Sequence, residues 1–289
     1  MKKLKELTMK DNWMFGAVMI QDDNCKQFLE RILGFQIESL TIDLEKSIVY
    51  HPEYKGIRMD VIAKDENRTH YNLEMQVLPK DFLPKRARYY SSQMDMELLA
   101  SGTPYRELPN VFVIFICDFD PFEIKKYLYQ FQMRTKEGLE LQDGSQYIFL
   151  STKGEDKDQV PEELVTFLEF VRSGLEESEK TYKDPYIAKL QKDIQKIKDS
   201  REMGRTYMWL EEMMEDERKE GREEGREEAL GAVRKHILTV LNRIGEVPEE
   251  VESLLENEKD LKVLDQLFET ALSAQEIEEF LQEMRKLCS

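Results

Sequence analysis

Two acidic residues, Asp60 and Glu74, lie in a stretch whose pattern is able to bring their carboxylates together. Apolar and polar residues alternate over residues 57–64 and again over 71–77, which is the pattern of two strands. The polar run 65–68 between them has the composition of a hairpin turn. If the numbers of paired residues sum to 134, the two acids lie opposite each other with Cβ atoms roughly 5 Å apart.

Facing carboxylates need a partner, because like charges repel and burial raises the pKa of at least one acid. A hard, oxygen-liganded cation such as Mg²⁺ between them removes both penalties. The same spacing also fits a simpler structure, in which the register is shifted and both side chains point into water. Spacing alone leaves the metal site and the solvated strand face equally open.

A resemblance to a known family favours the metal site. Asp60, thirteen residues, then Glu74-Met75-Gln76 on paired strands resembles the PD-(D/E)XK nuclease superfamily, and more closely its branch of nuclease-family transposases, the recombination-promoting nucleases. Further segments follow that family's order over roughly residues 7–172: LTMKDNWMFGAVM, NCKQFLERILGF, GIRMDV, LPKRARYY, VIFICDFDPF, IFLSTKG and EELVTFLEFV. The resemblance implies an α/β fold with a restriction-endonuclease-like core, in which helices flank a central mixed β-sheet.

The resemblance also implies an activity, the hydrolysis of DNA phosphodiester bonds by a divalent-metal-dependent endonuclease. Asp60, Glu74 and the backbone carbonyl of Met75 would hold Mg²⁺ or Mn²⁺, which polarises the phosphate and lowers the pKa of an attacking water. Asp11 would support this site from the first helix. Without the resemblance, a helix cap is sufficient explanation for an aspartate at that place.

Gln76 departs from the pattern, since most of the superfamily has lysine there. A neutral amide can only hydrogen-bond, whereas an ammonium group also stabilises developing negative charge. Related branches carry Glu-x-Gln as well, so the departure is compatible with activity but leaves the general base unassigned. Water on a second metal ion and a substrate phosphate oxygen are the two candidates.

Arg86 and Tyr90 match an arginine and a tyrosine in the family's next helix, which is predicted here from Pro84 to Gly102. Arg86 would stabilise the scissile phosphate, and Tyr90 would donate a hydrogen bond or stack on a base. Each has a simpler explanation. Arg86 is otherwise an exposed helix charge, and Tyr90 a core aromatic.

The remaining pattern predicts the elements around these residues. Helices are expected over residues 8–20 and 25–34, the second ending at Gly34. A first strand begins at Leu40, and a buried strand at 111–117 should run parallel to its neighbour. Shorter strands are expected at 127–133 and 147–150, and a helix at 164–171.

Three regions are expected along the chain: a nuclease-like domain at 1–185, a long charged amphipathic helical arm at 186–230, and a small helical module at 231–289. The arm is expected as one helix running from Ile187 through Met213 into GREEGREE. Such charge usually marks a solvated helix, and Glu-Gly-rich arms are similar to those that follow the domain in this family. The last region is expected to form a homo-oligomer or to bind a partner.

Composition weighs against strong DNA binding, because the net charge is −17 and residues 200–289 alone carry 13 Lys and Arg against 24 Asp and Glu. The rival hypothesis is therefore an inactive nuclease fold that works as an interaction module. No GxSxG, P-loop or CxxC motif supports another enzyme class or a zinc site, and the three histidines form no cluster. Widely spaced cysteines and the absence of an apolar leader or membrane-length segment predict a cytoplasmic protein without membrane association.

Overall fold

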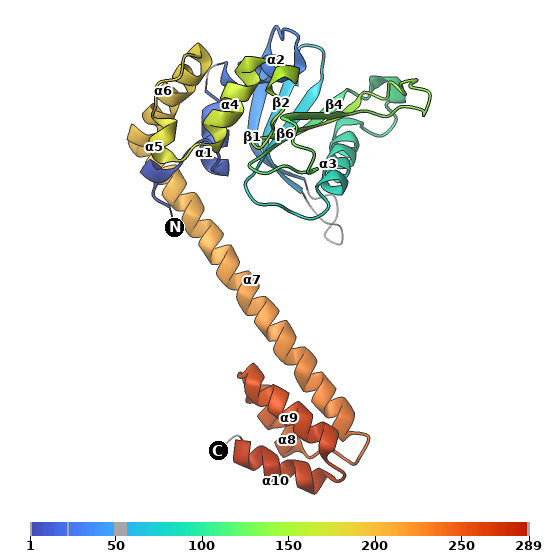
Figure 1. The fold of residues 1–289 in the computed structure, drawn as a ribbon. Helices are drawn as coiled ribbons and strands as arrows, with labels where there is room; N and C mark the ends of the chain where they lie inside the picture. Colours follow the sequence, from blue (N-terminus) through green and yellow to red (C-terminus); the bar gives the residue numbers. More distant parts are fainter. Residues whose placement is uncertain (1, 22, 49–56, 288–289) are drawn as a thin grey trace. The chain divides into compact units, whose positions relative to one another are not determined.

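The computed structural model describes residues 2–21, 23–48 and 57–287. They form two compact units, Met1–Tyr207 and Met208–Ser289, and the sections below treat each unit by itself (Figure 1). Among the helices in these ranges, none combines the length and the apolar character that crossing a membrane requires.

A six-stranded mixed sheet forms the centre of the first unit, in the order β1-β2-β3-β4-β6-β5. The first three strands are antiparallel neighbours, β4 is parallel to both β3 and β6, and β5 returns antiparallel along the edge. The strands are β1 (Leu40–Ile48), β2 (Ile57–Asp65), β3 (His70–Gln76), β4 (Val111–Cys117), β5 (Leu128–Phe131) and β6 (Ser145–Ser151).

The β2–β3 hairpin has the register predicted from the sequence, with Val61 opposite Leu73 and Lys64 opposite His70. A buried carboxylate, that of Asp65, fixes the turn. It accepts hydrogen bonds from the amides of Asn67 and Thr69 at 2.9 and 2.8 Å and from the Tyr71 hydroxyl at 2.8 Å. Because a slip of one residue would move every side chain to the other face, this turn decides where the acids point.

The two faces of the sheet are covered by different helices (Figure 1). Apolar side chains of one face, such as Leu73 and Ile114, share a core with α1, α2, α4 and α6. The opposite face, with Val113 and Phe115, packs against α3. These helices are α1 (Asn12–Met19), α2 (Asn24–Leu33), α3 (Leu83–Leu98), α4 (Glu162–Arg172) and α6 (Pro185–Asp199), and α5 (Leu175–Ser178) precedes α6.

Helix α6 belongs to the first unit. Its apolar residues Ile187, Leu190, Ile194 and Ile197 are buried in the core shared with α1 and α2. Arg31 also holds its first turn, donating to both carboxylate oxygens of Asp184 at 2.6 and 2.9 Å. The amphipathic face predicted here therefore has its partner helices within the same unit.

The expectation of one continuous helix from Ile187 onward is wrong. Ser200 has an extended backbone (φ −76°, ψ 123°) that ends α6, and its hydroxyl accepts the amide of Met203 at 3.2 Å. A serine that caps the next helix gives the chain a natural break. The long helix is therefore α7 (Arg201–Leu241), and the division of the chain at residues 185 and 230 stays a prediction.

The second unit is all-helical. The end of α7 packs with α8 (Glu249–Asn257), α9 (Leu261–Ser273) and α10 (Ile277–Leu287). Their shared core includes Leu230, Ile237, Leu264, Leu267 and Phe280. This region was expected to be a small helical module. The structure agrees, because three short helices and the end of α7 share one core.

The predicted fold class is confirmed: helices flank a mixed sheet, and a long helix and a small all-α region follow. Every predicted strand of the first unit is present. Two strand limits differ from the prediction: β5 is shorter than the predicted 127–133, and β6 is longer than the predicted 147–150.

Candidate metal and phosphate site

Asp60 and Glu74 meet where β2 and β3 separate. Backbone pairing of the hairpin stops at Val61 and Leu73, and side chains take over the next hydrogen bonds. The Asp60 amide donates to Glu74 Oε1 at 3.3 Å, and the Met75 amide donates to Asp60 Oδ2 at 3.0 Å. Each carboxylate thus accepts the amide of the opposite strand, which brings the two acids to one place.

Burial makes this pair electrostatically unfavourable. The Glu74 side chain is 1 % exposed, while Asp60 is half-buried. Burial first, and then the charge of Asp60, raise the pKa of Glu74 to about 8, although the Arg86 guanidinium opposes the shift. A site of this kind favours whatever brings positive charge to it, whether a proton or a metal cation.

Arg86 is the cation that the structure supplies. Its Nη2 donates to Glu74 Oε2 at 2.9 Å, and its Nη1 donates to Gln76 Oε1 at 2.9 Å. Both Nε and Nη2 donate to the Tyr90 hydroxyl, at 2.9 and 2.6 Å. The spacing of four residues on α3 stacks Arg86 and Tyr90 on one helix face, so the planar fork reaches three acceptors together.

Tyr90 completes this cluster as a buried phenol. Burial, followed by the charge of Glu74, raises the pKa of Tyr90 to about 12. The hydroxyl therefore stays protonated at neutral pH and is a permanent hydrogen-bond donor.

Gln76 takes part through both ends of its amide. Its Oε1 accepts from Arg86, and its Nε2 donates to the Met75 carbonyl at 3.0 Å. A carbonyl oxygen has two lone pairs, so the Met75 oxygen can accept this bond and still face a cation. The glutamine thus orients the arginine fork.

Asp11 lies at the first turn of α1 but has other partners than expected. Its carboxylate accepts the Thr8 amide at 2.7 Å and the Lys2 ammonium at 2.6 Å, and it makes no capping bond to the helix. No hydrogen bond of Asp11 within the described residues reaches Asp60 or Glu74. The contact from this helix comes from Asn12, whose Nδ2 lies 3.4 Å from Asp60 Oδ2. Sequence reasoning missed Asn12, although it is the next residue of the predicted helix.

A second residue that sequence reasoning missed is Asn72, which shares the alternation of Glu74 and Gln76. Asn72 is fully buried, and neither its side-chain nitrogen nor its oxygen has a hydrogen-bond partner of acceptable geometry in the described chain. Its amide nevertheless lies close enough to the Glu74 carboxylate to favour the charged form. A buried amide of this kind suits a hydrated ligand at the site.

The oxygens of this site fit a hard, partly hydrated divalent cation. Two carboxylates and the Met75 carbonyl are oxygen donors, and Mg²⁺ commonly keeps several waters while binding only one or two carboxylates. Within residues 2–21, 23–48 and 57–287, no three His, Cys, Asp or Glu side chains lie close enough together to bind one ion, so the protein would supply two carboxylates and the Met75 carbonyl here, and water the other ligands. Oxygen atoms of this kind are the ligands that hard divalent cations prefer.

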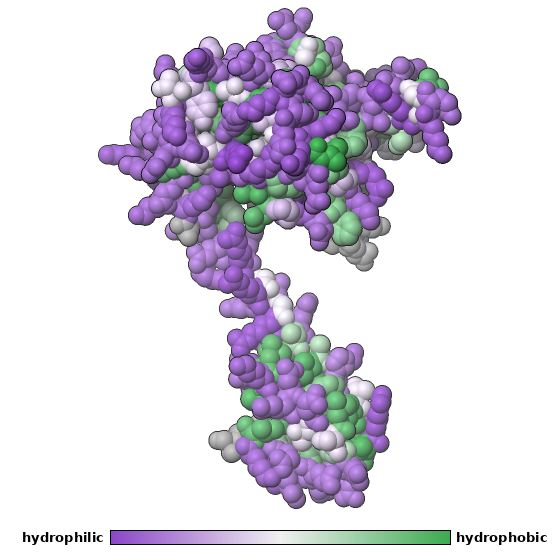
Figure 2. Space-filling model, viewed as in Figure 1, coloured by the Kyte–Doolittle hydropathy of each residue, from purple (hydrophilic) through white to green (hydrophobic). Residues whose placement is uncertain are grey.

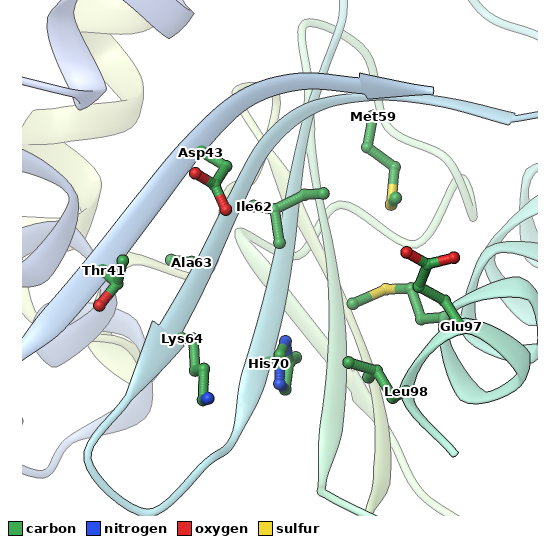
Figure 3. A pocket seen from close by; sticks show the side chains of 10 residues that line it. Thr41, Asp43, Met59, Ile62, Ala63, Lys64, His70, Glu97 and Leu98 are labelled. Atoms are coloured by element: carbon green, nitrogen blue, oxygen red, sulfur yellow. The ribbon is translucent and has the colours of Figure 1, made fainter. Parts of the chain in front are cut away.

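A separate cavity of about 200 Å³ lies farther along the same face of the hairpin, between the strands and α3 (Figure 3). Polar side chains from Asp43, Lys64, His70 and Glu97 line it together with apolar residues such as Met59. His70 lies four residues before Glu74 on β3, which is roughly 13 Å along a strand. Glu97, near the C-terminal end of α3, closes this cavity on the helix side.

Comparison with known proteins identifies the family. No curated protein matches the sequence. The family model of PD-(D/E)XK nuclease family transposases matches residues 12–229, which is most of the chain and includes both strands of the acidic hairpin and helix α3. The match begins directly after Asp11. The mixed sheet flanked by helices is the α/β restriction-endonuclease-like fold of such nucleases, and the chain belongs to the PD-(D/E)XK nuclease family transposases.

Proposed function

We propose that this protein is a divalent-metal-dependent endonuclease that hydrolyses phosphodiester bonds in DNA. The observation that carries the proposal is the hydrogen-bonded pair of Asp60 and Glu74, with Arg86 beside it. Family membership supports a nuclease of the transposase type, and PD-(D/E)XK nucleases generally use divalent metals.

Asp60, Glu74 and the Met75 carbonyl would hold Mg²⁺ or Mn²⁺. When bound, the ion would polarise the phosphate and lower the pKa of a water molecule. The chain's own residues orient the reacting groups. Gln76 and Tyr90 fix the plane of the Arg86 guanidinium, and one Nη1–H stays available to donate to a phosphate oxygen. Asn12 holds the Asp60 carboxylate from α1, and Asp11 remains a proposed supporting residue at that helix end.

Nicking of supercoiled plasmid tests this proposal. The intact chain should nick plasmid with Mg²⁺ or Mn²⁺ and not with EDTA, and Asp60→Asn and Glu74→Gln should each abolish nicking. Asp43→Asn is the matched control, because it neutralises an exposed carboxylate on the neighbouring strand β1. Nicking that persists in both site variants would refute the assignment of the active site.

A catalytically inactive interaction module is the second candidate, and one observation favours it. Arg86 lies 2.9 Å from Glu74, so the fold offers this acid a cationic partner without a metal ion. An inactive protein would show neither nicking by the intact chain nor any Mg²⁺-dependent increase in thermal stability. The plasmid assay and a thermal-shift titration therefore separate the two candidates.

We propose that the second unit associates with another copy of the chain. Hydrophobic side chains gather on the visible face of this unit (Figure 2), and Leu272 is 55 % exposed. Sedimentation velocity of the intact chain beside residues 1–207 tests this, because α6 must stay with its core. Equal association states would contradict the proposal. A reducing cytoplasm stays the predicted location, and the described cysteines, Cys25 and Cys117, are buried free thiols.

A further inference from the structure

A basic segment borders the carboxylate site. We call residues 77–89, which join β3 to the first half of α3, the basic rim. It contains Lys80, Lys85, Arg86 and Arg88 but one acid, Asp81, in a chain whose net charge is −17. Within the described residues, no carboxylate pairs with Lys80, Lys85 or Arg88, and all three are exposed. The segment is therefore positively charged in an otherwise acidic chain, which favours binding of a polyanion such as nucleic acid.

Two large apolar side chains project from the same rim. Leu78 is 71 % exposed and Phe82 is 69 % exposed. The Phe82 backbone has φ 62° and ψ 31°, a left-handed conformation that is unfavourable for a bulky residue. The Phe82 carbonyl accepts the Arg86 amide at 3.0 Å, which ties this conformation to the first turn of α3. The fold thus holds an aromatic ring in solvent at the expense of backbone strain.

Phe82 is tied through the backbone to the arginine of the proposed phosphate site. It directly precedes Leu83, the first residue of α3, and its carbonyl accepts the amide of Arg86. The Arg86 side chain contacts Glu74, so the first turn of α3 connects the exposed ring to the carboxylate site. The Lys85 ammonium lies 4.9 Å from the centre of the Phe82 ring, so cation and ring are presented together.

We propose that the basic rim binds single-stranded or unpaired nucleic acid, with one base stacked on Phe82 and the flanking phosphates held by Lys80, Lys85 and Arg88. Aromatic rings flanked by cations bind single strands because every base has a stacking face. A fully paired duplex keeps those faces covered, so it offers the rim only its phosphates. This inference rests on the proposed nuclease function for the position of the scissile phosphate.

Fluorescence anisotropy of the intact chain tests the proposal, with labelled dT20 and a blunt duplex of equal length in EDTA, where no cleavage occurs. The intact chain should bind dT20 more tightly than the duplex. Phe82→Ala should weaken dT20 binding about tenfold, and Phe82→Trp should preserve it. Lys80→Gln with Lys85→Gln should reduce the slope of log affinity against log salt by about 1.4, for two lost phosphate contacts on a single strand.

Tyr105→Ala is the matched control. Tyr105 is an 86 % exposed aromatic beyond the other end of α3, outside the rim, so its removal should leave dT20 binding unchanged. Equal dT20 affinity in the intact chain and Phe82→Ala would overturn the proposal. So would a change of sedimentation coefficient in Phe82→Ala, because the ring would then be covered by a second copy of the chain.

The same variants separate this inference from the nuclease proposal. If dT20 binding depends on Phe82 but nicking persists in the Asp60 and Glu74 variants, the active-site assignment is refuted and the single-strand proposal stands. If nicking requires both acids but dT20 binding is unchanged in Phe82→Ala, the single-strand proposal is refuted and the nuclease proposal stands.

Discussion

Replacing Glu74 by glutamine should make the metal-free protein more stable at neutral pH, although it removes a proposed metal ligand. The Glu74 side chain is 1 % exposed, and its pKa is raised from 4.5 to about 8. A carboxyl group whose pKa rises on folding binds a proton more tightly in the folded chain. Its contribution to stability is therefore largest below pH 4.5 and is lost as the pH rises toward 8.

The size of the effect follows from this shift. At pH 7.5, folding requires the Glu74 carboxylate to bind a proton. Because the pKa of this group in the unfolded chain lies three units below the buffer pH, binding the proton costs about 4 kcal/mol of folding free energy. Glutamine has no such cost but pairs less well with Arg86, so a gain of about 3 kcal/mol is expected. In a unit of this size, that gain corresponds to a Tm increase of about 6–12 °C.

Thermal unfolding in EDTA at pH 5.5 and 7.5 measures this difference. The gain should shrink to well below about 1 kcal/mol at pH 5.5, where only one pH unit separates the buffer from the pKa of the unfolded chain and the poorer pairing of glutamine with Arg86 offsets most of the difference. Mg²⁺ should stabilise the intact chain at pH 7.5 and leave Glu74→Gln unchanged. A variant that is less stable than the intact chain at pH 7.5, or a difference independent of pH, would refute the electrostatic reasoning.

Three further predictions concern other parts of the chain. Arg86→Lys should lower plasmid nicking by about 10²-fold, because a lysine cannot replace a fork that meets several acceptors, and unchanged nicking would exclude a role at the phosphate. Burial alone would raise the pKa of Asp184, but hydrogen bonds from Arg31 and a backbone amide outweigh burial, so the pKa lies below the usual value of 3.8 for an aspartate. Its contribution to stability is thus fully present above pH 3.8 and declines as the pH falls from there through the lowered pKa. Asp184→Asn should therefore destabilise the chain by about 2 kcal/mol at pH 7 and by less at pH 3, as denaturant unfolding at the two pH values would show. Replacing Gly221 and Gly225 by alanine should stabilise α7 by about 1 kcal/mol each, since no atom lies within 4 Å of the added methyl groups, and circular dichroism during heating measures it.

Much of the fold was predictable because it depends on local patterns. Alternation gave the hairpin strands, and the unbroken apolar run of residues 111–117 gave β4, which is fully buried and parallel to β3. Gly34 ends α2 in the left-handed conformation expected of it (φ 76°). The break at Ser200 was missed because the apolar rhythm of α6 continues in α7, and a single capping hydroxyl is a weaker signal than that rhythm.

The sequence by itself placed Asp60 and Glu74 on one face of a predicted hairpin, since strand alternation and hairpin length are local properties of the chain, but it left the register open. The tertiary structure decided what surrounds the pair. Asn12 and Arg86 reach it from helices on opposite faces of the sheet, and Asp11 is drawn instead to Lys2 and Thr8. Such contacts depend on where separate helices pack, and packing is set by the whole core rather than by the spacing of residues along one strand.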